Sequence, residues 1–472
     1  MGLLLSFGLP TLLGMLFQQF YNLMDTMIVG KLLGAQALAA VGSTSSINFF
    51  VIGFCMGVCN GFAIPVAQRM GAGDYPRMRR HVANAAYLSI LFSLVLTTAT
   101  GLLCRTILTA MNTPADIFDG AYWYIFIIFM GIPATFLYNL LAGIIRSLGD
   151  SRTPVYFLAL SSALNIFLDF ALILWFDAGV AGAAIATVVS QAVSGLACLA
   201  YMGRKYPILR MSREERRLDP TSCRTLCLMG VPMGLQYSIT AIGSIVLQSA
   251  VNTLGSTYVA AVAAGTKLFQ LLGCPFDAMG ATMATYCGQN VGAGQLDRLG
   301  RGIRACSLLG AVYAAAAFAA MALFAAPCAM LFLDPAEPEL ALLVSLTSQY
   351  IQISTVFFFP LALVNIVRFS IQGMGYSAFA ILAGVLEMIA RTGVAFFLVP
   401  IFGYTAACFA SPAAWVCADL FLIPASMLCI RRLRAQGLSA PDRGGAAGSV
   451  PGGPEEGRSP RGSLSPGHSS PS

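Results

Sequence analysis

The sequence predicts an all-α integral membrane protein with twelve transmembrane helices in two six-helix lobes. Hydrophobic residues make up 57% of its 472 residues and only 10% are charged, whereas a soluble domain carries about 25% charged residues. The mean hydropathy of +0.77 agrees with this interpretation. A water-soluble globule of this length could not cover its surface with so few charges, so the composition excludes that class.

Uncharged runs of roughly 20 residues, long enough to cross the hydrocarbon of a bilayer, occur twelve times along the chain. The run from 225 to 266 is too long for one helix, and we divide it at the turn signal Asn252–Gly255. No basic segment precedes the first run, so no cleavable signal peptide is expected. The predicted spans are residues 3–28, 37–67, 82–104, 118–145, 153–176, 179–202, 225–249, 258–287, 303–326, 340–367, 377–399 and 403–430.

Basic residues lie mostly on one side of the predicted membrane. With a cytoplasmic N-terminus, the cytoplasmic segments hold most of the 27 lysines and arginines, and the outer loops hold Lys31 and Arg105. By the positive-inside rule this predicts a multi-pass protein of the plasma (inner) membrane with both termini cytoplasmic. The net charge of +7 does not indicate nucleic-acid binding, because no polar segment interleaves basic with aromatic residues.

The sequence offers little material for catalysis or for binding a metal. Its 13 cysteines form no Cys-x-x-Cys motif and lie mostly in apolar runs, which is typical of buried, reduced thiols. The only histidines are His81 and His468. No Walker loop is present, so ATP is not expected to drive the protein directly. We therefore expect neither an enzyme nor a resident cofactor or metal.

An internal repeat divides the chain into two halves. Gln68–Arg77 matches Gln289–Arg298 through a shared Gln-x-x-Gly-Ala-Gly motif. Leu33-Gly34 matches Leu254-Gly255 at the same offset. Six spans is an even number, so both halves enter from the same side and are related by an axis along the membrane normal. The predicted units are an N-terminal six-helix lobe at 1–202, a cytoplasmic loop at 203–224, a second six-helix lobe at 225–436 and a disordered cytoplasmic tail at 437–472.

The two halves differ in their charged residues within the membrane. Asp25 and Asp169 of the first half align with apolar residues of the second, and Asn165 aligns with Arg391. Acidic residues without a partner are costly inside a membrane and indicate function. The first half is therefore predicted to carry a role that the second half lacks.

Several segments carry a family signature in combination: Gln18–Gly30, Arg146–Pro154, Leu164–Asp169, Gly179–Thr187 and the duplicated Gln-x-x-Gly-Ala-Gly motif. Together they resemble the multidrug and toxic compound extrusion (MATE) family, over about residues 3–432. The resemblance implies a secondary active antiporter. Such a protein exports organic, often cationic, compounds in exchange for H+ or Na+ by alternating access.

The resemblance also implies that the coupling ion binds at Asp25, Asn165, Asp169 and Thr187. One branch of the family carries acidic residues in helices seven and ten, where this chain has Ser238–Thr240 and Ala362. The pattern is similar to that of the bacterial DinF-like branch, whose essential acids lie in the first lobe. The expected partners are small organic substrates and the lipid bilayer, and the expected state is a monomer.

Helix geometry groups the same four residues independently. The helical rise places Asp25 roughly 8 Å, and Asp169 and Thr187 about 12 Å, below the outer ends of their spans. Asn165 and Asp169 share one helical face. Na+ would require about five or six oxygen ligands, and a proton would require one carboxyl group whose pKa is raised by burial and by its acidic neighbour. Both ions remain open at this point. The supporting polar residues on the same stripe as Asp25 are Gln18 and Asn22.

Other charged residues within the spans are open between structural and functional roles. Glu387 and Arg391, at i,i+4 on the eleventh span, are predicted to form a structural ion pair. Lys267 and Asp277 are roughly 15 Å apart on the eighth span and so do not pair. These two residues are candidates for the substrate cavity, and Asp419 is a further candidate to attract a cationic substrate.

A flippase for a lipid-linked or other amphiphilic substrate is the alternative function, since related two-lobe folds perform it. A flippase would place several basic residues in its cavity to hold a pyrophosphate group. Within the predicted spans only Lys267 and Arg391 are basic, which favours the exporter.

Overall fold

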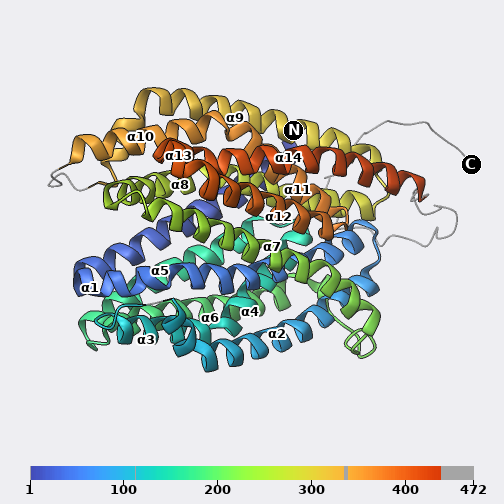
Figure 1. Cartoon of the computed structure of the whole chain (residues 1–472). Coiled ribbons are helices and arrows are strands. Elements are labelled where there is room, and N and C mark those ends of the chain that lie inside the picture. Colours follow the sequence, from blue (N-terminus) through green and yellow to red (C-terminus); the bar gives the residue numbers. More distant parts are fainter. Residues whose placement is uncertain (1, 112, 334–338, 437–472) are drawn as a thin grey trace, which may run out of the picture. The chain divides into compact units, whose positions relative to one another are not determined.

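The computed structural model describes residues 2–111, 113–333 and 339–436, and the regular elements of these residues are helices (Figure 1). The predicted tail at 437–472 lies outside the described residues. The principal helices are α1 (Gly2–Gly71), α2 (Tyr75–Ala110), α3 (Phe118–Met130), α4 (Ile132–Ser147), α5 (Arg152–Leu174), α6 (Gly179–Lys205), α7 (Pro220–Asn252), α8 (Ser256–Gly292), α9 (Leu296–Met330), α10 (Leu340–Val356), α11 (Phe358–Gly373), α12 (Ser377–Gly393), α13 (Val399–Phe402) and α14 (Tyr404–Ala435). Two short elements, η1 (Pro207–Leu209) and η2 (Val394–Leu398), complete the set.

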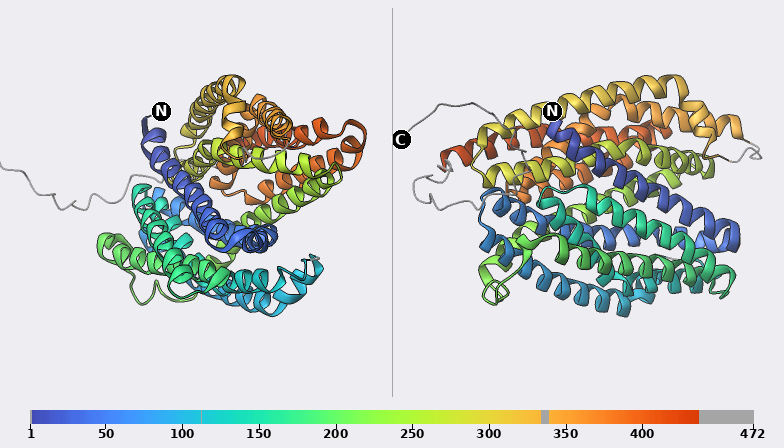
Figure 2. Two further views of the ribbon diagram at one scale, coloured as in Figure 1. Left: turned by 90° about the vertical axis from the view of Figure 1, so that its left-hand side faces the viewer. Right: turned by 180° about the vertical axis from the view of Figure 1, so that it is seen from behind.

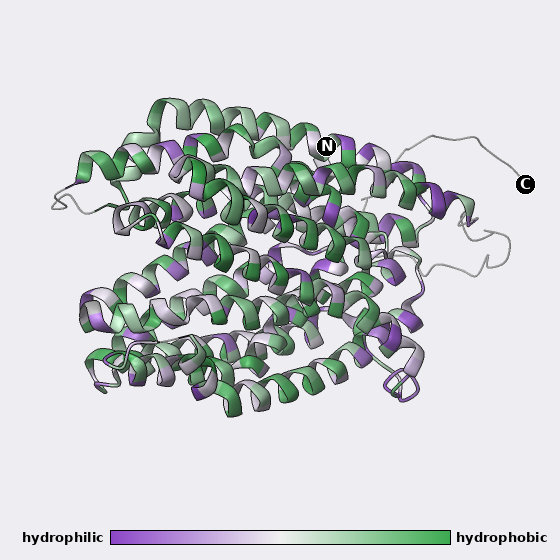
Figure 3. Ribbon diagram, in the orientation of Figure 1, coloured by the Kyte–Doolittle hydropathy of each residue, from purple (hydrophilic) through white to green (hydrophobic). Residues whose placement is uncertain are grey.

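The described helices account for the predicted spans. Nine are long and apolar enough to cross a membrane, and the bent pairs α3–α4 and α10–α11 raise the number to eleven. The first predicted span lies in the helical stretch of α1 before Gly34. This stretch is long enough to be a twelfth membrane span. Hydrophobic residues follow the length of the helices, and hydrophilic residues gather toward their ends, most visibly in the loop before α7 (Figure 3). The predicted all-α membrane fold is confirmed.

Two large hydrophobic cores hold these helices together. One is built from residues between Ala40 and Leu226, and the other from residues between Phe276 and Leu433 together with Leu4. The start of α1 therefore packs on the second group of helices, where a Cβ added to Gly8 would lie 3.3 Å from Thr282 Oγ1 of α8. Figure 2 shows this dark-blue start of α1 lying against the yellow-to-red helices before α1 continues among the blue-to-green ones.

The internal repeat is visible in the backbone. The matching residues Gly34 and Gly255 have φ angles of 84° and 116°, and Gly73 and Gly294 have φ angles of 70° and 69°. Glycine is favoured there because a Cβ atom would clash in this left-handed region. Gly34 divides α1 into two helical stretches, and Gly255 separates α7 from α8. The turn predicted at Asn252–Gly255 is thus confirmed.

Two of the predicted spans are bent pairs of helices, which the sequence did not reveal. The axes of α3 and α4 meet at 46°, and those of α10 and α11 meet at 52°. Pro133 lies in the first turn of α4 and has no amide hydrogen with which to continue the helix from α3. Pro360 has the same effect shortly after the break at Phe357.

Arg146 and Arg368, which lie just beyond the ends of the fourth and tenth predicted spans, continue the helices of those spans. Arg146 is in α4, where its guanidinium donates a hydrogen bond of 3.3 Å to Asn60 Oδ1. Arg368 is in α11 and is only 6% exposed. The predicted spans ended at the first charged residue, at 145 and 367. The helices continue past these points because both arginines find polar partners inside the protein.

Candidate coupling-ion site

Four polar side chains from three helices meet in the first half of the chain. Asp25 lies on α1 before the kink, Asn165 and Asp169 lie one turn apart on α5, and Thr187 lies on α6. Asn165 and Asp169 are both 0% exposed, and the other two are half-buried. The structure therefore brings together all four residues that were predicted to bind the coupling ion.

Thr187 joins the three helices through its hydroxyl group. Thr187 Oγ1 accepts hydrogen bonds from the Tyr21 hydroxyl of α1 at 3.2 Å and from Asn165 Nδ2 of α5 at 3.3 Å. It donates to the carbonyl oxygen of Ala183, one turn earlier on α6, at 3.1 Å. These bonds use the hydroxyl group of Tyr21 and one N–H of the Asn165 amide and fix the orientation of that amide. The amide oxygen of Asn165 has no hydrogen-bond partner among the described residues.

The carboxyl groups of Asp25 on α1 and Asp169 on α5 lie within electrostatic range of each other. Asp25 Oδ1, Asn165 Oδ1 and both carboxyl oxygens of Asp169 are buried, and none of them accepts a hydrogen bond from a described residue. Buried acceptors without donors are costly in a medium of low dielectric constant. A proton shared by the two carboxyl groups, or a Na+ ion among the four oxygens, removes this cost.

Two carboxyl groups are the acidic members of this set of side chains. Within the described ranges, no three His, Cys, Asp or Glu side chains are arranged to hold a metal ion. Two carboxylates and neutral oxygens carry at most two negative charges, so one bound H+ or Na+ lowers the buried charge of the site from −2 to −1.

Two tyrosines of the site were missed by the sequence analysis. Tyr21 lies one turn before Asp25 on the same helical face, so the polar stripe of α1 contained the signal that could have found it. Tyr124 of α3 is 7% exposed and lies within electrostatic range of both Asp25 and Asp169. Its position in an aromatic run of α3 gave no sequence signal, because only the packing of α3 on the other helices brings it near.

The predicted supporting residues Gln18 and Asn22 lie on α1 but are not joined to this set by hydrogen bonds. Gln18 is half-buried and Asn22 is exposed. Neither side chain forms a hydrogen bond to Asp25, Asn165, Asp169 or Thr187. Their supporting role remains a prediction.

The second half of the chain holds a buried cluster of opposite charges. The predicted pair of Glu387 and Arg391 on α12 is confirmed at 3.5 Å. Arg368 of α11 pairs with the same carboxylate, so two guanidinium groups share it. All three residues are at most 7% exposed. Asp419 of α14 is also buried and lies within electrostatic range of Arg368.

Lys267 and Asp277 of α8 are both exposed and do not pair with each other, as predicted. In the part of the chain that the structure describes, neither forms an ion pair. Asp277 lies within electrostatic range of Tyr237 of α7, which also senses Arg146 and Arg368. Tyr237 thus lies within electrostatic range of charged residues of α4, α8 and α11.

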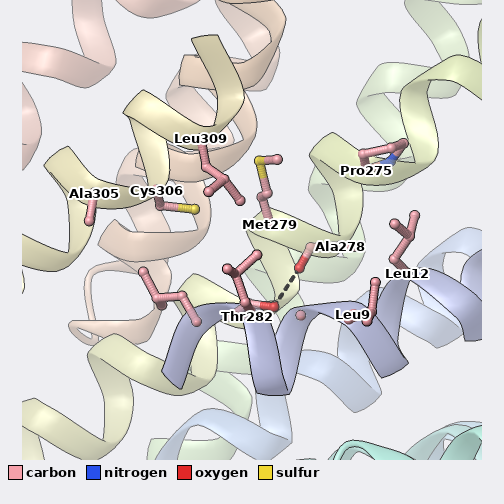
Figure 4. A pocket seen from close by; sticks show the side chains of 12 residues that line it. Leu9, Leu12, Pro275, Ala278, Met279, Thr282, Ala305, Cys306 and Leu309 are labelled. Atoms are coloured by element: carbon pink, nitrogen blue, oxygen red, sulfur yellow. Dashed lines mark hydrogen bonds between the residues drawn. The ribbon is translucent and has the colours of Figure 1, made fainter. Parts of the chain in front are cut away.

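A separate cavity of about 90 Å³ lies between the start of α1, α8 and α9. Figure 4 shows Leu9 and Leu12 of α1 on one side of it, with Pro275, Met279 and Leu309 around it. Its lining contains no charged residue, and the hydroxyl of Thr282 is turned to the carbonyl oxygen of Ala278. The cavity therefore lacks the chemistry to bind a coupling ion.

Known proteins were compared with the chain as a whole. The MatE family model matches residues 10–171 and 232–397. "Probable multidrug resistance protein YpnP" of Bacillus subtilis (strain 168) is 31% identical over 301 residues, which are 63% of this chain and 66% of that protein. The alignment thus spans just under two thirds of that relative's length. The "FAD transporter" of Shewanella oneidensis is 26% identical over 344 residues, 70% of this chain and 74% of that protein.

Solved structures share the fold. One described as "Outward-facing conformation of a multidrug resistance MATE family transporter of the MOP superfamily" has a TM-score of 0.85 at 21% identity, covering 92% of this chain and 96% of that chain. Another, "Crystal structure of MATE in complex with MaL6", has a TM-score of 0.84 at 22% identity, covering 92% and 97%. At these identities the match shows the fold alone.

Proposed function

Because the chain belongs to the MatE family of membrane transporters, we propose that it is a secondary active exporter of organic, often cationic, compounds. Export is driven by the inward flow of H+ or Na+ and proceeds by alternating access between two six-helix lobes. The observation that carries this proposal is the set of buried acceptor oxygens on Asp25, Asn165 and Asp169, which lack donors. Such a set is what a site for a small cation requires before its ion arrives.

The first lobe is proposed to hold the coupling ion alone, as in the DinF-like branch. Where the first half places Asn165 and Asp169, the second half has Arg391 and Ala395. The guanidinium of Arg391 is already paired with Glu387, so this part of the second half carries its own positive charge, which disfavours binding of a second cation.

The proposed orientation places both termini in the cytoplasm, because the basic loops then lie inside. The substrate is proposed to reach the space between the lobes, where the exposed Asp277 and Lys267 of α8 contact it. The names of the relatives, multidrug resistance proteins and a FAD transporter, support organic substrates of considerable size. The working unit is proposed to be a monomer, since each chain contains both lobes.

Transport by the purified full chain in proteoliposomes tests this function. A fluorescent organic cation such as ethidium is the probe. Three sets of vesicles are compared, with a pH gradient without Na+, with a Na+ gradient at constant pH, and with neither gradient. We expect concentrative movement of ethidium in one of the first two sets and only equilibration in the third. The set that supports movement identifies the ion.

The variant Asp25→Asn isolates the proposed site. It keeps the volume and polarity of the side chain but removes the charge that holds the ion, so gradient-driven movement should stop. The matched control is Asp116→Asn, the same change at an exposed residue between α2 and α3. Concentrative transport by Asp25→Asn at the level of Asp116→Asn would show that this carboxyl group does not couple the ion.

A further inference from the structure

The duplicated Gln-x-x-Gly-Ala-Gly motif, which the coupling site does not use, lies at the ends of α1 and α8. Gln68 Nε2 of α1 donates a hydrogen bond of 3.0 Å to the carbonyl oxygen of Gly373. Gln289 Nε2 of α8 donates one of 2.9 Å to the carbonyl oxygen of Ser147. Gly373 ends α11 and Ser147 ends α4. Each glutamine thus reaches from its own half of the chain to a helix end in the other half.

Two glycines of the motif bring the same helices into direct backbone contact. A Cβ added to Gly71 would overlap the carbonyl oxygen of Gln289, and one added to Gly292 would overlap the carbonyl oxygen of Gln68. Glycine is therefore required here for space between the helices. At this crossing not even a methyl group fits between α1 and α8.

The two hydrogen bonds are suited to being made and broken. Carbonyl groups in the last turn of a helix have no partner within the helix, so Gly373 and Ser147 are free to accept from a side chain or from water. Both glutamines are only partly buried. Water can replace the amide when the helices separate, which keeps the cost of opening low.

We propose that Gln68, Gly71, Gln289 and Gly292, here named the helix-end clasp, form the gate that closes the transporter toward the cytoplasm. The clasp must separate before a substrate can enter between the two halves from that side. This inference rests on the alternating access and the orientation proposed above. It assigns a function to the part of the repeat that is the same in both halves, whereas ion coupling uses the part that differs.

Hydrogen–deuterium exchange of the full chain in lipid nanodiscs tests the clasp, followed by mass spectrometry of peptides from the ends of α1 and α8. No substrate and no ion gradient is present. In the double variant Gln68→Ala/Gln289→Ala we expect exchange in these peptides to be about 30-fold faster than in the wild type. This corresponds to the loss of two hydrogen bonds of about 1 kcal/mol each. Gly292→Ala should speed exchange more, because the added methyl group prevents closure.

Two control variants carry the same chemical changes elsewhere. Gly42→Ala adds a methyl group to α1 at a point where no atom lies within 4 Å. Gln349→Ala removes an amide that donates to Thr405 Oγ1 at 3.3 Å within the second half. Both should exchange like the wild type at the ends of α1 and α8.

Unchanged exchange at the helix ends in the double glutamine variant would overturn the proposal. That variant removes only two hydrogen bonds and therefore decides the question even if Gly292→Ala fails to fold. Because the measurement involves no ion gradient, its outcome is separate from the coupling proposal. If Asp25→Asn still transported, the ion site would be wrong, but faster exchange in the clasp variants would still identify the gate.

Discussion

Replacing Asp169 with Asn should make the protein more stable and at the same time unable to concentrate its substrate. In the wild type, both carboxyl oxygens of Asp169 are buried without a donor, and the side chain lies within electrostatic range of Asp25. The Asn amide has the same volume, removes one of two adjacent negative charges and supplies an N–H group next to the Asp25 carboxylate. A hydrogen bond to a charged group contributes about 1.5–3 kcal/mol, so unfolding should become harder by roughly that amount.

The expected loss in the substrate concentration ratio follows from the transport of one ion per cycle. A single charge that crosses a potential of 100 mV releases about 2.3 kcal/mol. Because about 1.4 kcal/mol corresponds to a factor of ten, the wild type can hold a neutral substrate at a ratio of about 50 across the membrane. Without the ionisable pair the variant cannot use this energy, and the ratio should fall to about 1.

Two measurements on the same preparation check this prediction. Thermal unfolding in nanodiscs reports stability, and the steady-state ratio of an uncharged fluorescent probe in energised vesicles reports coupling. The reasoning is refuted if Asp169→Asn keeps a ratio near that of the wild type with the same ion requirement. A variant that loses both stability and transport would show that the carboxyl group serves packing rather than coupling.

Four further outcomes are expected. Glu387→Gln should destabilise the protein by about 3–5 kcal/mol in thermal unfolding, because its two guanidinium partners then lack a buried counter-charge; unchanged stability would contradict this. Hydrogen bonds from Arg79 lower the pKa of Glu215 from 4.5 to about 2, so this ion pair stabilises the protein above pH 4.5 and is lost as the pH falls toward 2. The stability difference between the wild type and Glu215→Gln should shrink over that range, and a constant difference would disprove the assignment. Pro10→Ala should restore a helical hydrogen bond in α1 and so reduce coupled transport. Full transport activity of this variant in vesicles would contradict the prediction. Deleting residues 437–472 should leave transport intact, and a well-inserted but inactive truncation would contradict this.

The positions of the spans were predictable because the signal is local. Uncharged runs and glycine turns mark helices and their breaks, as at Gly255 between α7 and α8. The same rule failed at Arg146 and Arg368, where a charge was taken as the end of a span. Whether an arginine ends a helix or continues inside the protein depends on partners such as Glu387, which are distant in the sequence.

The site was predictable only in part, for the same reason. Depth in the membrane and helical spacing grouped Asp25 with Asn165 and Asp169, because both follow from the rise of a helix. Tyr124 could not be found in this way, since its approach to the carboxyl pair depends on how α3 packs. The lack of hydrogen-bond donors around Asp169 is also a tertiary property, because it depends on the side chains of all the neighbouring helices.

The clasp also has the symmetry of a contact between two identical subunits. Gln68 bonds to the end of α11, and its repeat counterpart Gln289 bonds to the equivalent end of α4. Reciprocal contact of this kind, in which each patch binds the other's counterpart, defines the isologous interface of a symmetric homodimer. The junction between the halves therefore has the reciprocity of a symmetric dimer interface within a single chain. The reciprocity is confined to the motif, since the second half has Arg391 where the first has Asn165.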